Sequence, residues 1–265
     1  MGYKGNIKMT EKKTAWTPSA GDETQNSRFR REQEGFFEKY INNRTVLDIG
    51  CGKQKIDPLA RGWDIAKGDG DATELKGIES ESFATIYSSH LLEHIDDPMK
   101  ALSRWWECVA VGGYLIVAVP DEDLYEQGKW PSIFNPDHRT TWTIHKTKSW
   151  SPMSKNLIDL IKNLPGHKVI SLRILDTRYD YTQHLSDQGT AERQVEVIVQ
   201  KTGEPEPWVS TVPVTPVCVC GAQRSLKLLG IYSRGKVLVQ CQSCGQQLVW
   251  DAVKELQKLG VVKSG

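Results

Sequence analysis

Residues 45–52 read Thr-Val-Leu-Asp-Ile-Gly-Cys-Gly, a short apolar run that ends in an acidic residue and a Gly-x-Gly turn. This pattern is typical of the first strand of an α/β fold that presents a ligand at the carboxyl end of the strand. Glycine there lets the backbone take a positive φ and approach a ligand closely. A dinucleotide-binding turn would require a third glycine where this chain has Lys55, which argues against NAD or FAD. The alternative is an ordinary buried strand followed by a turn.

The stretch resembles the first motif of class I S-adenosylmethionine-dependent methyltransferases, and six further segments continue the resemblance in order. They are Gly-Trp-Asp at 62–64, Gly-Asp-Ala at 70–72, Ser-Phe-Ala-Thr-Ile-Tyr at 82–87, His-Leu-Leu-Glu-His-Ile at 90–95, Gly-Gly-Tyr-Leu-Ile-Val at 112–117 and Val-Pro at 119–120. Several matches in the right order are more specific than any single motif. The resemblance implies a Rossmann-like, doubly wound α/β fold: a seven-stranded, mostly parallel sheet with helices on both faces and an antiparallel last strand at 195–199.

The resemblance also implies a cofactor site for S-adenosylmethionine. Asp48 matches the acidic residue that helps hold the cofactor's ammonium group, and Asp64 matches the residue whose carboxylate accepts from both ribose hydroxyls. The other implied cofactor-binding residues are Gly50 and Gly52 beneath the cofactor, Asp71 and Ala72 at the adenine, and Ser89 and His90 near the sulfonium.

Alternatives are open at several of these positions. For Asp48 the alternative is a carboxylate that caps its local turn, and Asp69 competes with Asp64 for the ribose. Both carboxylates are candidates because residues 53–61, interrupted by Pro58, are too short for a full crossover helix between parallel strands. The register of the second strand is therefore open. His90 and His94 are also candidates for structural histidines bonded to backbone carbonyls.

The acceptor is expected to contact residues 121–150, an aromatic insertion without clear periodicity that follows a predicted strand. Long loops of this kind are often substrate lids. Candidate catalytic residues are Asp121, His90 and His138, with His145 as a second candidate base, because a hydroxyl acceptor requires a base. The alternative is that the tryptophans of this segment anchor a structural loop to the core.

The regular elements follow from apolar spacing and from start and stop residues. We expect helices from Ser27 to Ile41, from Pro98 to a stop at Gly112-Gly113, and from Ser151-Pro152 to Leu164. Strands are expected at 83–88, 114–119, 169–175 and 194–200.

Outside the methyltransferase domain, assigned to 27–201, the sequence predicts three further parts. Residues 1–26 form a polar arm, and residues 202–216 form a proline-rich linker. Residues 217–265 resemble a zinc ribbon, with a hairpin at 226–240, a final helix containing Trp250 and a structural zinc ion. Its candidate metal ligands are Cys218, Cys220, Cys241 and Cys244, although the first pair has one intervening residue instead of two.

The chain has 34 Lys plus Arg and 33 Asp plus Glu, a formal net charge of +1, so no global field favours nucleic acid or an anionic membrane. No long apolar run or secretory signal is present, and we expect a cytoplasmic location. The predicted function is methyl transfer to a small-molecule or sugar-like acceptor, at oxygen. An RNA or protein methyltransferase that binds its substrate through the ribbon is the alternative, and a non-catalytic scaffold is another. The oligomeric state is left open.

Overall fold

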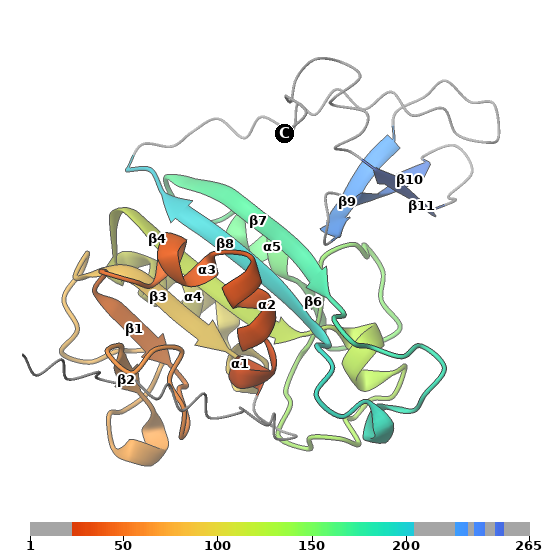
Figure 1. Cartoon of the computed structure of the whole chain (residues 1–265), viewed down its shortest axis with the longest axis horizontal. Helices are drawn as coiled ribbons and strands as arrows, with labels where there is room; N and C mark the ends of the chain where they lie inside the picture. Colours follow the sequence, from red (N-terminus) through yellow and green to blue (C-terminus); the bar gives the residue numbers. More distant parts are fainter. Residues whose placement is uncertain (1–22, 204–225, 233–235, 242–246, 252–265) are drawn as a thin grey trace, which may run out of the picture.

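The computed structural model describes residues 23–203, 226–232, 236–241 and 247–251 of the chain. Its strands form one sheet in the order β11-β10-β9-β7-β8-β4-β3-β1-β2, and two short strands, β5 and β6, pair separately (Figure 1). Strands β1, β2, β3 and β4 are mutually parallel, β8 is antiparallel to both β4 and β7, and β9 is parallel to β7.

The strands are β1 Val46–Ile49, β2 Arg61–Trp63, β3 Phe83–Ser89, β4 Val109–Pro120, β5 Thr141–Thr143, β6 Ser154–Asn156, β7 His167–Leu175, β8 Gln194–Lys201, β9 Leu226–Tyr232, β10 Lys236–Cys241 and β11 Gln247–Asp251. The helices are α1 Glu23–Asn26, α2 Arg28–Gln33, α3 Phe36–Tyr40, α4 Pro98–Cys108 and α5 Leu157–Ile161. Short helical turns are η1 Ile65–Lys67, η2 Leu92–His94, η3 Glu122–Glu126 and η4 Leu185–Asp187.

Between residues 46 and 201 the sheet has six strands, not the seven predicted. The missing strand would lie in the segment after β2, where residues 64–82 form η1 and turns and contain no strand. Three glycines with positive φ, at 68, 70 and 77, interrupt any extended run there. The predicted antiparallel strand is confirmed as β8, and the short crossover from β1 to β2 contains no helix.

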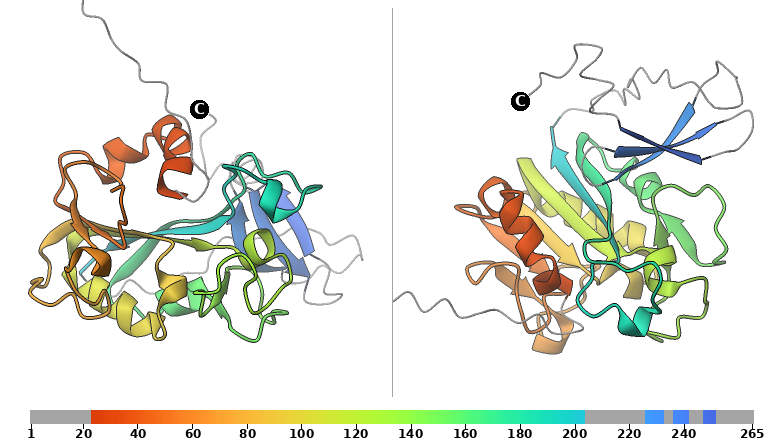
Figure 2. Two further views of the ribbon diagram at one scale, coloured as in Figure 1. Left: turned by 90° about the horizontal axis from the view of Figure 1, so that it is seen from below. Right: turned by 45° about the vertical axis from the view of Figure 1, so that its right-hand side comes forward.

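Helices cover both faces of the sheet, as expected. The helices α2 and α3 lie on one face, and α4 and α5 lie on the other (Figures 1 and 2). Phe36, Phe37 and Ile41 pack on the first face with Val46 and Ile116. The larger core, on the other face, contains the buried side chains of α4 and α5, among them Leu102, Trp105, Trp106, Leu157 and Ile161.

A buried ionic network attaches α2 to β8. Arg31 is fully buried and donates to Glu196 Oε2 at 3.1 Å and to the Tyr87 hydroxyl at 2.8 Å. Arg30 donates to Glu192 at 2.9 Å. Arg173 on β7 bonds Glu196 Oε1 at 2.9 Å. Although burial alone would raise it, the three guanidinium groups lower the pKa of Glu196 to about 2.

The first predicted helix, from Ser27 to Ile41, is not continuous. Two short helices, α2 and α3, replace it, because Gly35 takes a φ of +65° between them. The side chain of Phe29, which fits the apolar spacing, is exposed, whereas Arg30 and Arg31 are buried. Ser27 makes no helix-capping bond and instead accepts from Gln194 Nε2 at 2.8 Å.

The start of α4 is confirmed, since Asp97 accepts from Lys100 N and Pro98 occupies the first turn. Its predicted stop is wrong, because the helix ends at Cys108 and the glycines belong to β4. Between β3 and β4 the pairing shifts from Phe83 with Val109 to Thr85 with Tyr114, and this irregularity accommodates the two glycines. A Cβ on Gly113 would lie 2.7 Å from the backbone oxygen of Ala84.

The third predicted helix begins later than expected. Residues 154–156 form β6, which pairs with β5, and α5 begins at Leu157 after an Asn156 cap. Met153, which fits the apolar spacing of the predicted helix, is exposed.

The predicted hairpin at 226–240 is confirmed, because β9 and β10 pair antiparallel, and β11 adds a strand that the sequence analysis did not predict. Trp250 lies in β11 and not in a helix. Cys241 is the last residue of β10. The other predicted zinc ligands, Cys218, Cys220 and Cys244, lie outside the described residues, as do most of the linker and residues 1–22 of the predicted arm. The last residues of that arm, 23–26, form α1. Among the described helices, none combines the length and apolar character needed to span a membrane.

Candidate functional site

The predicted site residues follow strand ends that meet at one edge of the sheet. Ile49 pairs with Trp63 of β2 and with Ser88 of β3, and Ser89 pairs with Ala118 of β4. The next residues along the chain therefore come to the same edge, and these are Gly50, Asp64, His90 and Asp121. In open α/β sheets this carboxyl edge is where ligands bind.

Both glycines after β1 have positive φ, +72° at Gly50 and +50° at Gly52. A Cβ on Gly50 would lie 2.9 Å from the side chain of Leu91, so this position also lacks the space for one. A Cβ on Gly52 would meet no atom within 4 Å. The turn is thus tightly packed beneath Gly50 and open beside Gly52.

Asp48 is buried within β1, and its Oδ2 accepts from Ile56 N at 2.6 Å. Burial raises the pKa of this carboxyl to about 7, against the lowering effect of the Ile56 bond. The side chain therefore closes the loop after Gly52, which is the turn-capping geometry that the sequence left open as an alternative. An ammonium group placed beside it would stabilise its ionised form.

Asp48→Asn is expected to change how stability depends on pH. The folded-state pKa lies above the ordinary value of 3.8, so the Asp48 carboxyl lowers the stability of the parent as the pH rises from about 4 to 7, and the variant lacks this contribution. The free energies of unfolding of parent and variant should diverge over this interval by up to about 4 kcal/mol, because the pKa of the carboxyl is about 7 in the folded protein instead of 3.8. Urea denaturation across the pH series measures this difference. Parallel profiles would mean that Asp48 is already ionised in the folded protein at pH 4.

Asp64 follows β2 and accepts from Gly52 N at 2.8 Å and from Ala66 N at 2.9 Å. Its two oxygens each keep a lone pair, and the side chain is partly exposed. Asp69 lies behind it and accepts from Asp64 N at 2.9 Å. Of the two rival carboxylates, Asp64 is the one bonded to the glycine turn.

Asp71 and Ala72 form a turn between η1 and β3. Asp71 Oδ1 accepts from Thr73 N at 2.7 Å, and this backbone hydrogen bond lowers the pKa of the carboxyl. The Ala72 carbonyl accepts from Trp105 Nε1 at 2.8 Å, which ties the turn to α4.

The end of β3 carries unpaired polar groups. The hydroxyls of Ser88 and Ser89 are buried without a hydrogen-bond partner. His90 has a φ of +53°, a conformation uncommon for a side-chain-bearing residue and frequent at functional sites. Its Nε2 lies 2.9 Å from Gln194 Oε1, and burial lowers its pKa, so the ring is neutral near pH 7.

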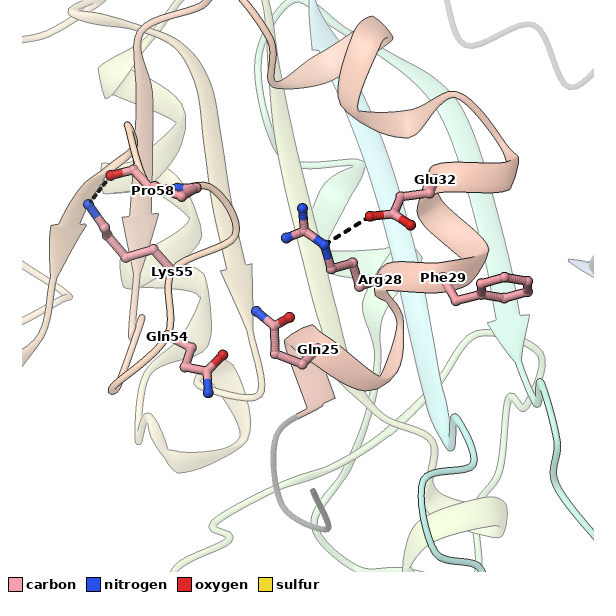
Figure 3. Close-up of a pocket in the computed structure, with 7 residues that line it drawn as sticks. All are labelled: Gln25, Arg28, Phe29, Glu32, Gln54, Lys55 and Pro58. Carbon is pink, nitrogen blue, oxygen red and sulfur yellow. Dashed lines mark hydrogen bonds and ion pairs between the residues drawn. The ribbon is translucent and has the colours of Figure 1, made fainter. Parts of the chain in front are cut away.

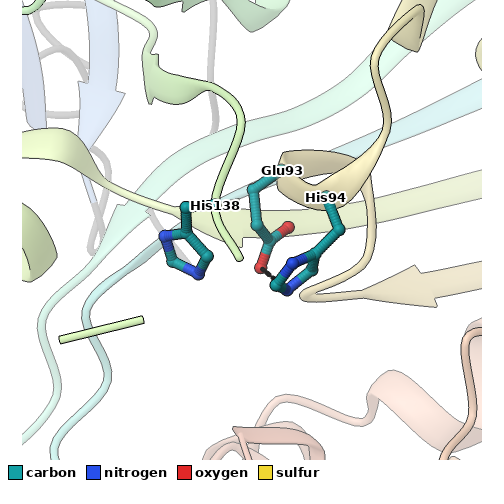
Figure 4. Close-up of side chains that lie close together, drawn as sticks. All are labelled: Glu93, His94 and His138. Carbon is teal, nitrogen blue, oxygen red and sulfur yellow. Dashed lines mark ion pairs between the residues drawn. The ribbon is translucent and has the colours of Figure 1, made fainter. Parts of the chain in front are cut away.

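A second set of side chains lies just beyond, where η2 meets the segment after β4. Glu93 is fully buried, neither of its carboxylate oxygens has a hydrogen-bond partner, and burial raises its pKa to about 8. The ring centroids of His94 and His138 are 5.0 Å apart. In Figure 4 the Glu93 carboxylate lies between the two rings.

Backbone contacts hold this cluster together. The Glu93 carbonyl accepts from Arg139 N at 2.8 Å and from Thr140 N at 3.2 Å, which brings His138 beside η2. His138 is buried, and its Nδ1 lies 2.7 Å from Glu126 Oε1. Glu93 and Glu126 are not among the site residues predicted from the sequence. The His-Leu-Leu-Glu-His run was the available signal for Glu93, whereas nothing local marked Glu126.

Asp121 follows β4 and is buried. Its Oδ1 accepts from Asp123 N at 3.0 Å and from Leu124 N at 3.1 Å, while its Oδ2 has no partner. Burial raises the pKa of this carboxyl to about 7. Asp121 therefore caps η3 with one oxygen and keeps the other available at the edge of the sheet.

Buried Glu122 anchors much of the segment 121–150. It accepts from Lys146 Nζ at 2.9 Å, Ser149 Oγ at 2.7 Å and Ser154 Oγ at 2.6 Å. His145 faces Asp123, with 3.8 Å between Nε2 and Oδ2, and burial lowers its pKa. His145 thus sits with this anchor and His138 with the Glu93 cluster, so the two candidate bases belong to different groups.

A cavity of about 730 Å³ lies between the N-terminal helices and the loop after Gly52. Gln25, Arg28, Phe29 and Glu32 line it from α1 and α2, and Gln54, Lys55 and Pro58 line it from the loop (Figure 3). None of the predicted site residues lines this cavity, although it adjoins the loop that Asp48 closes.

Comparison with known proteins gives a family match. Residues 22–151 match the family described as a methyltransferase domain. No curated protein matches the chain.

Three of the solved structures that are similar to this chain are described as methyltransferases, one of them as putative. One is an S-adenosylmethionine-dependent methyltransferase of Thermotoga maritima, 20% identical, with a TM-score of 0.45, covering 68% of this chain and 99% of its own. Another, from Archaeoglobus fulgidus, is 14% identical, with a TM-score of 0.41 and coverages of 68% and 97%. A third, from Listeria monocytogenes, is 14% identical, with a TM-score of 0.38 and coverages of 65% and 99%.

Proposed function

Since this chain is an S-adenosylmethionine-dependent methyltransferase, we propose that it methylates an oxygen of a small-molecule or sugar-like acceptor. The observation that carries the proposal is the convergence of Gly50, Gly52, Asp64 and His90 at the carboxyl edge of four parallel strands. Bound S-adenosylmethionine supplies a methyl group that its sulfonium has already activated. The protein then contributes orientation, exclusion of water and a base.

The residues at this edge fit the cofactor. The space beside Gly52 is open, the neighbouring Asp64 carboxylate has lone pairs for two hydroxyl donors, and the Ser89 hydroxyl is buried without a partner. We assign Asp64 to the ribose, Asp48 to the ammonium, Gly50 and Gly52 to the face beneath the cofactor, and Asp71 with Ala72 to the adenine.

The acceptor side is lined by buried acids, which supports an uncharged, hydroxyl-bearing acceptor. Glu93, Asp121 and Glu126 are all buried there. Burial raises the pKa of Glu93 to about 8 and that of Asp121 to about 7, so near pH 7 the first is largely and the second partly protonated. They offer hydrogen bonds to hydroxyl groups and no positive charge to a phosphate backbone. His90 is the candidate base nearest the end of β3, and its lowered pKa keeps it in the neutral form that accepts a proton.

We also propose that the four C-terminal cysteines, Cys218, Cys220, Cys241 and Cys244, hold a structural zinc ion. Their spacing in the sequence supports this, and so does the β9–β10 hairpin, which follows the first cysteine pair in the sequence and ends at Cys241, the first cysteine of the second pair. A small β-module of this kind commonly requires such a metal for stability.

Asp64→Asn is expected to weaken binding of S-adenosylmethionine by about 10–100-fold, because it removes a charged acceptor of two hydroxyl hydrogen bonds. Calorimetric titration of the cofactor and of its demethylated product measures this loss. Asp69→Asn is the matched control, since the amide oxygen of the new side chain can still accept from Asp64 N, and a change of less than about 3-fold is expected.

Two results would contradict these assignments. A greater loss in Asp69→Asn than in Asp64→Asn would transfer the ribose role to Asp69. No cofactor binding by the folded parent would overturn the assigned cofactor site. For the acceptor, transfer of a labelled methyl group to hydroxylated small molecules is expected, and labelling of RNA or protein alone would contradict the proposed substrate class.

A further inference from the structure

The cluster of Glu93, His94 and His138 lies beyond the predicted cofactor residues and has the composition of a metal site. One ligand atom from each residue can be chosen so that all lie within 4.8 Å of one another. We propose that these three side chains bind a divalent cation of the zinc type, with open coordination positions facing the acceptor. Two imidazoles and one carboxylate with an open position are typical of catalytic zinc and of other borderline transition metals.

The two histidines are oriented as metal ligands are. His94 Nδ1 lies 3.1 Å from the carbonyl oxygen of Asp137, and His138 Nδ1 lies 2.7 Å from Glu126 Oε1. When Nδ1–H donates to such an oxygen, the lone pair of the ring is on Nε2. Metal-binding histidines almost always have this support from a carbonyl or a carboxylate behind the ring.

Glu93 gives the independent second observation. Its side chain is buried, it faces both rings, and neither oxygen has a hydrogen-bond partner. Its nearest basic atoms are His90 Nδ1 at 3.5 Å and His94 Nε2 at 3.9 Å. An unpaired carboxylate in such a place is costly, and a cation bound between the rings would pair it.

The geometry requires only a small adjustment. Two ligands bonded to one zinc ion at about 2.0–2.2 Å lie roughly 3.5 Å apart. His138 is held by Glu126, whereas the His94 side chain is partly exposed and has room for a small shift toward it. Because two of the three ligands are nitrogens, the site should prefer zinc to magnesium.

This assignment changes the role of His138 from a candidate base to a ligand and leaves His90 as the proton acceptor. The cation would bind an acceptor oxygen beside the cofactor edge. That last step rests on the proposed function, whereas metal binding itself does not.

The test measures zinc in the full-length protein after equilibration with zinc and removal of excess. Parent and variants share the C-terminal cysteines, so zinc held there cancels in the comparison. Glu93→Gln and His138→Gln are expected to bind about one equivalent less than the parent. His167→Gln is the matched control, because His167 begins β7 opposite Lys201, at the other edge of the sheet.

Affinity and stability provide further readouts. Titration of zinc should show a site weakened more than about 100-fold by Glu93→Gln and about 10–100-fold by Glu126→Gln, which removes only the support behind His138. Zinc should raise the melting temperature of the parent more than that of Glu93→Gln. Because Glu93 is unpaired, Glu93→Gln should fold at least as stably as the metal-free parent.

Equal zinc content and equal affinity in the parent and Glu93→Gln would overturn the proposal. Selective binding of magnesium would overturn the assigned class of metal. Since these measurements need neither cofactor nor acceptor, their failure is distinguishable from failure of the proposed methyl transfer.

Discussion

Glu196→Gln is expected to lower the free energy of unfolding by about 3–5 kcal/mol. The fully buried Glu196 carboxylate pairs with Arg31 at 3.1 Å and Arg173 at 2.9 Å, and it lies 3.5 Å from Arg30. The amide cannot neutralise these guanidinium groups, and it has one accepting oxygen, whereas the carboxylate accepts from Arg31 with one oxygen and from Arg173 with the other. Urea denaturation measures the loss.

Glu32→Gln is the matched control. Glu32 pairs with Arg28 on the same helix, and both side chains are exposed, so a change below about 0.5 kcal/mol is expected. A loss of the same small size in Glu196→Gln would mean that α2 is not attached to the sheet through this network.

The loss of stability in Glu196→Gln should also depend on pH. Glu196 has a folded-state pKa of about 2 against an ordinary value of 4.5. Its contribution is therefore complete above pH 4.5 and is lost as the pH falls toward 2. The difference in stability between parent and variant should shrink over that interval and stay constant above it.

Local patterns in the sequence predicted the part of the fold that lies around the glycine turn. Gly50 needs both a positive φ and a missing Cβ, and Asp97-Pro98 caps a helix through adjacent atoms. Such requirements act within a few residues, so they can be read from the sequence. The positions of Asp64 and His90 at one edge follow once the strands are known to be parallel.

The features that the sequence did not predict depend on distant partners. Arg30 and Arg31 look like solvent-exposed residues in a polar helix, and their partners Glu192 and Glu196 are more than 160 residues away. Glu126 becomes part of the candidate site only because the chain returns to bring His138 against it. The break at Gly35 and the shift of pairing at Gly113 likewise reflect tertiary packing that overrides local spacing.

Trp142→Ala is expected to lower the free energy of unfolding by about 3–5 kcal/mol, the range for truncating a large buried aromatic side chain. Trp142 lies in β5, is fully buried and belongs to the larger core. It also pairs with Asp121 through an isolated bridge directly after β4. Denaturation monitored by circular dichroism measures the effect without relying on tryptophan fluorescence.

Trp150→Ala is the control from the same segment. Trp150 is 37% exposed, and its Nε1 donates to Asp123 Oδ1 at 3.0 Å, so a loss of about 1 kcal/mol is expected. The difference between the stability losses of Trp142→Ala and Trp150→Ala indicates how much of the segment 121–150 can act as a lid. With Trp142 and Glu122 buried, opening of the whole segment would expose part of the core, so substrate-linked motion should be confined to residues 127–137. Amide hydrogen exchange in Trp142→Ala tests this confinement of the motion. Faster exchange throughout residues 121–150 with unchanged global stability would contradict it, because the segment would then open independently of the core.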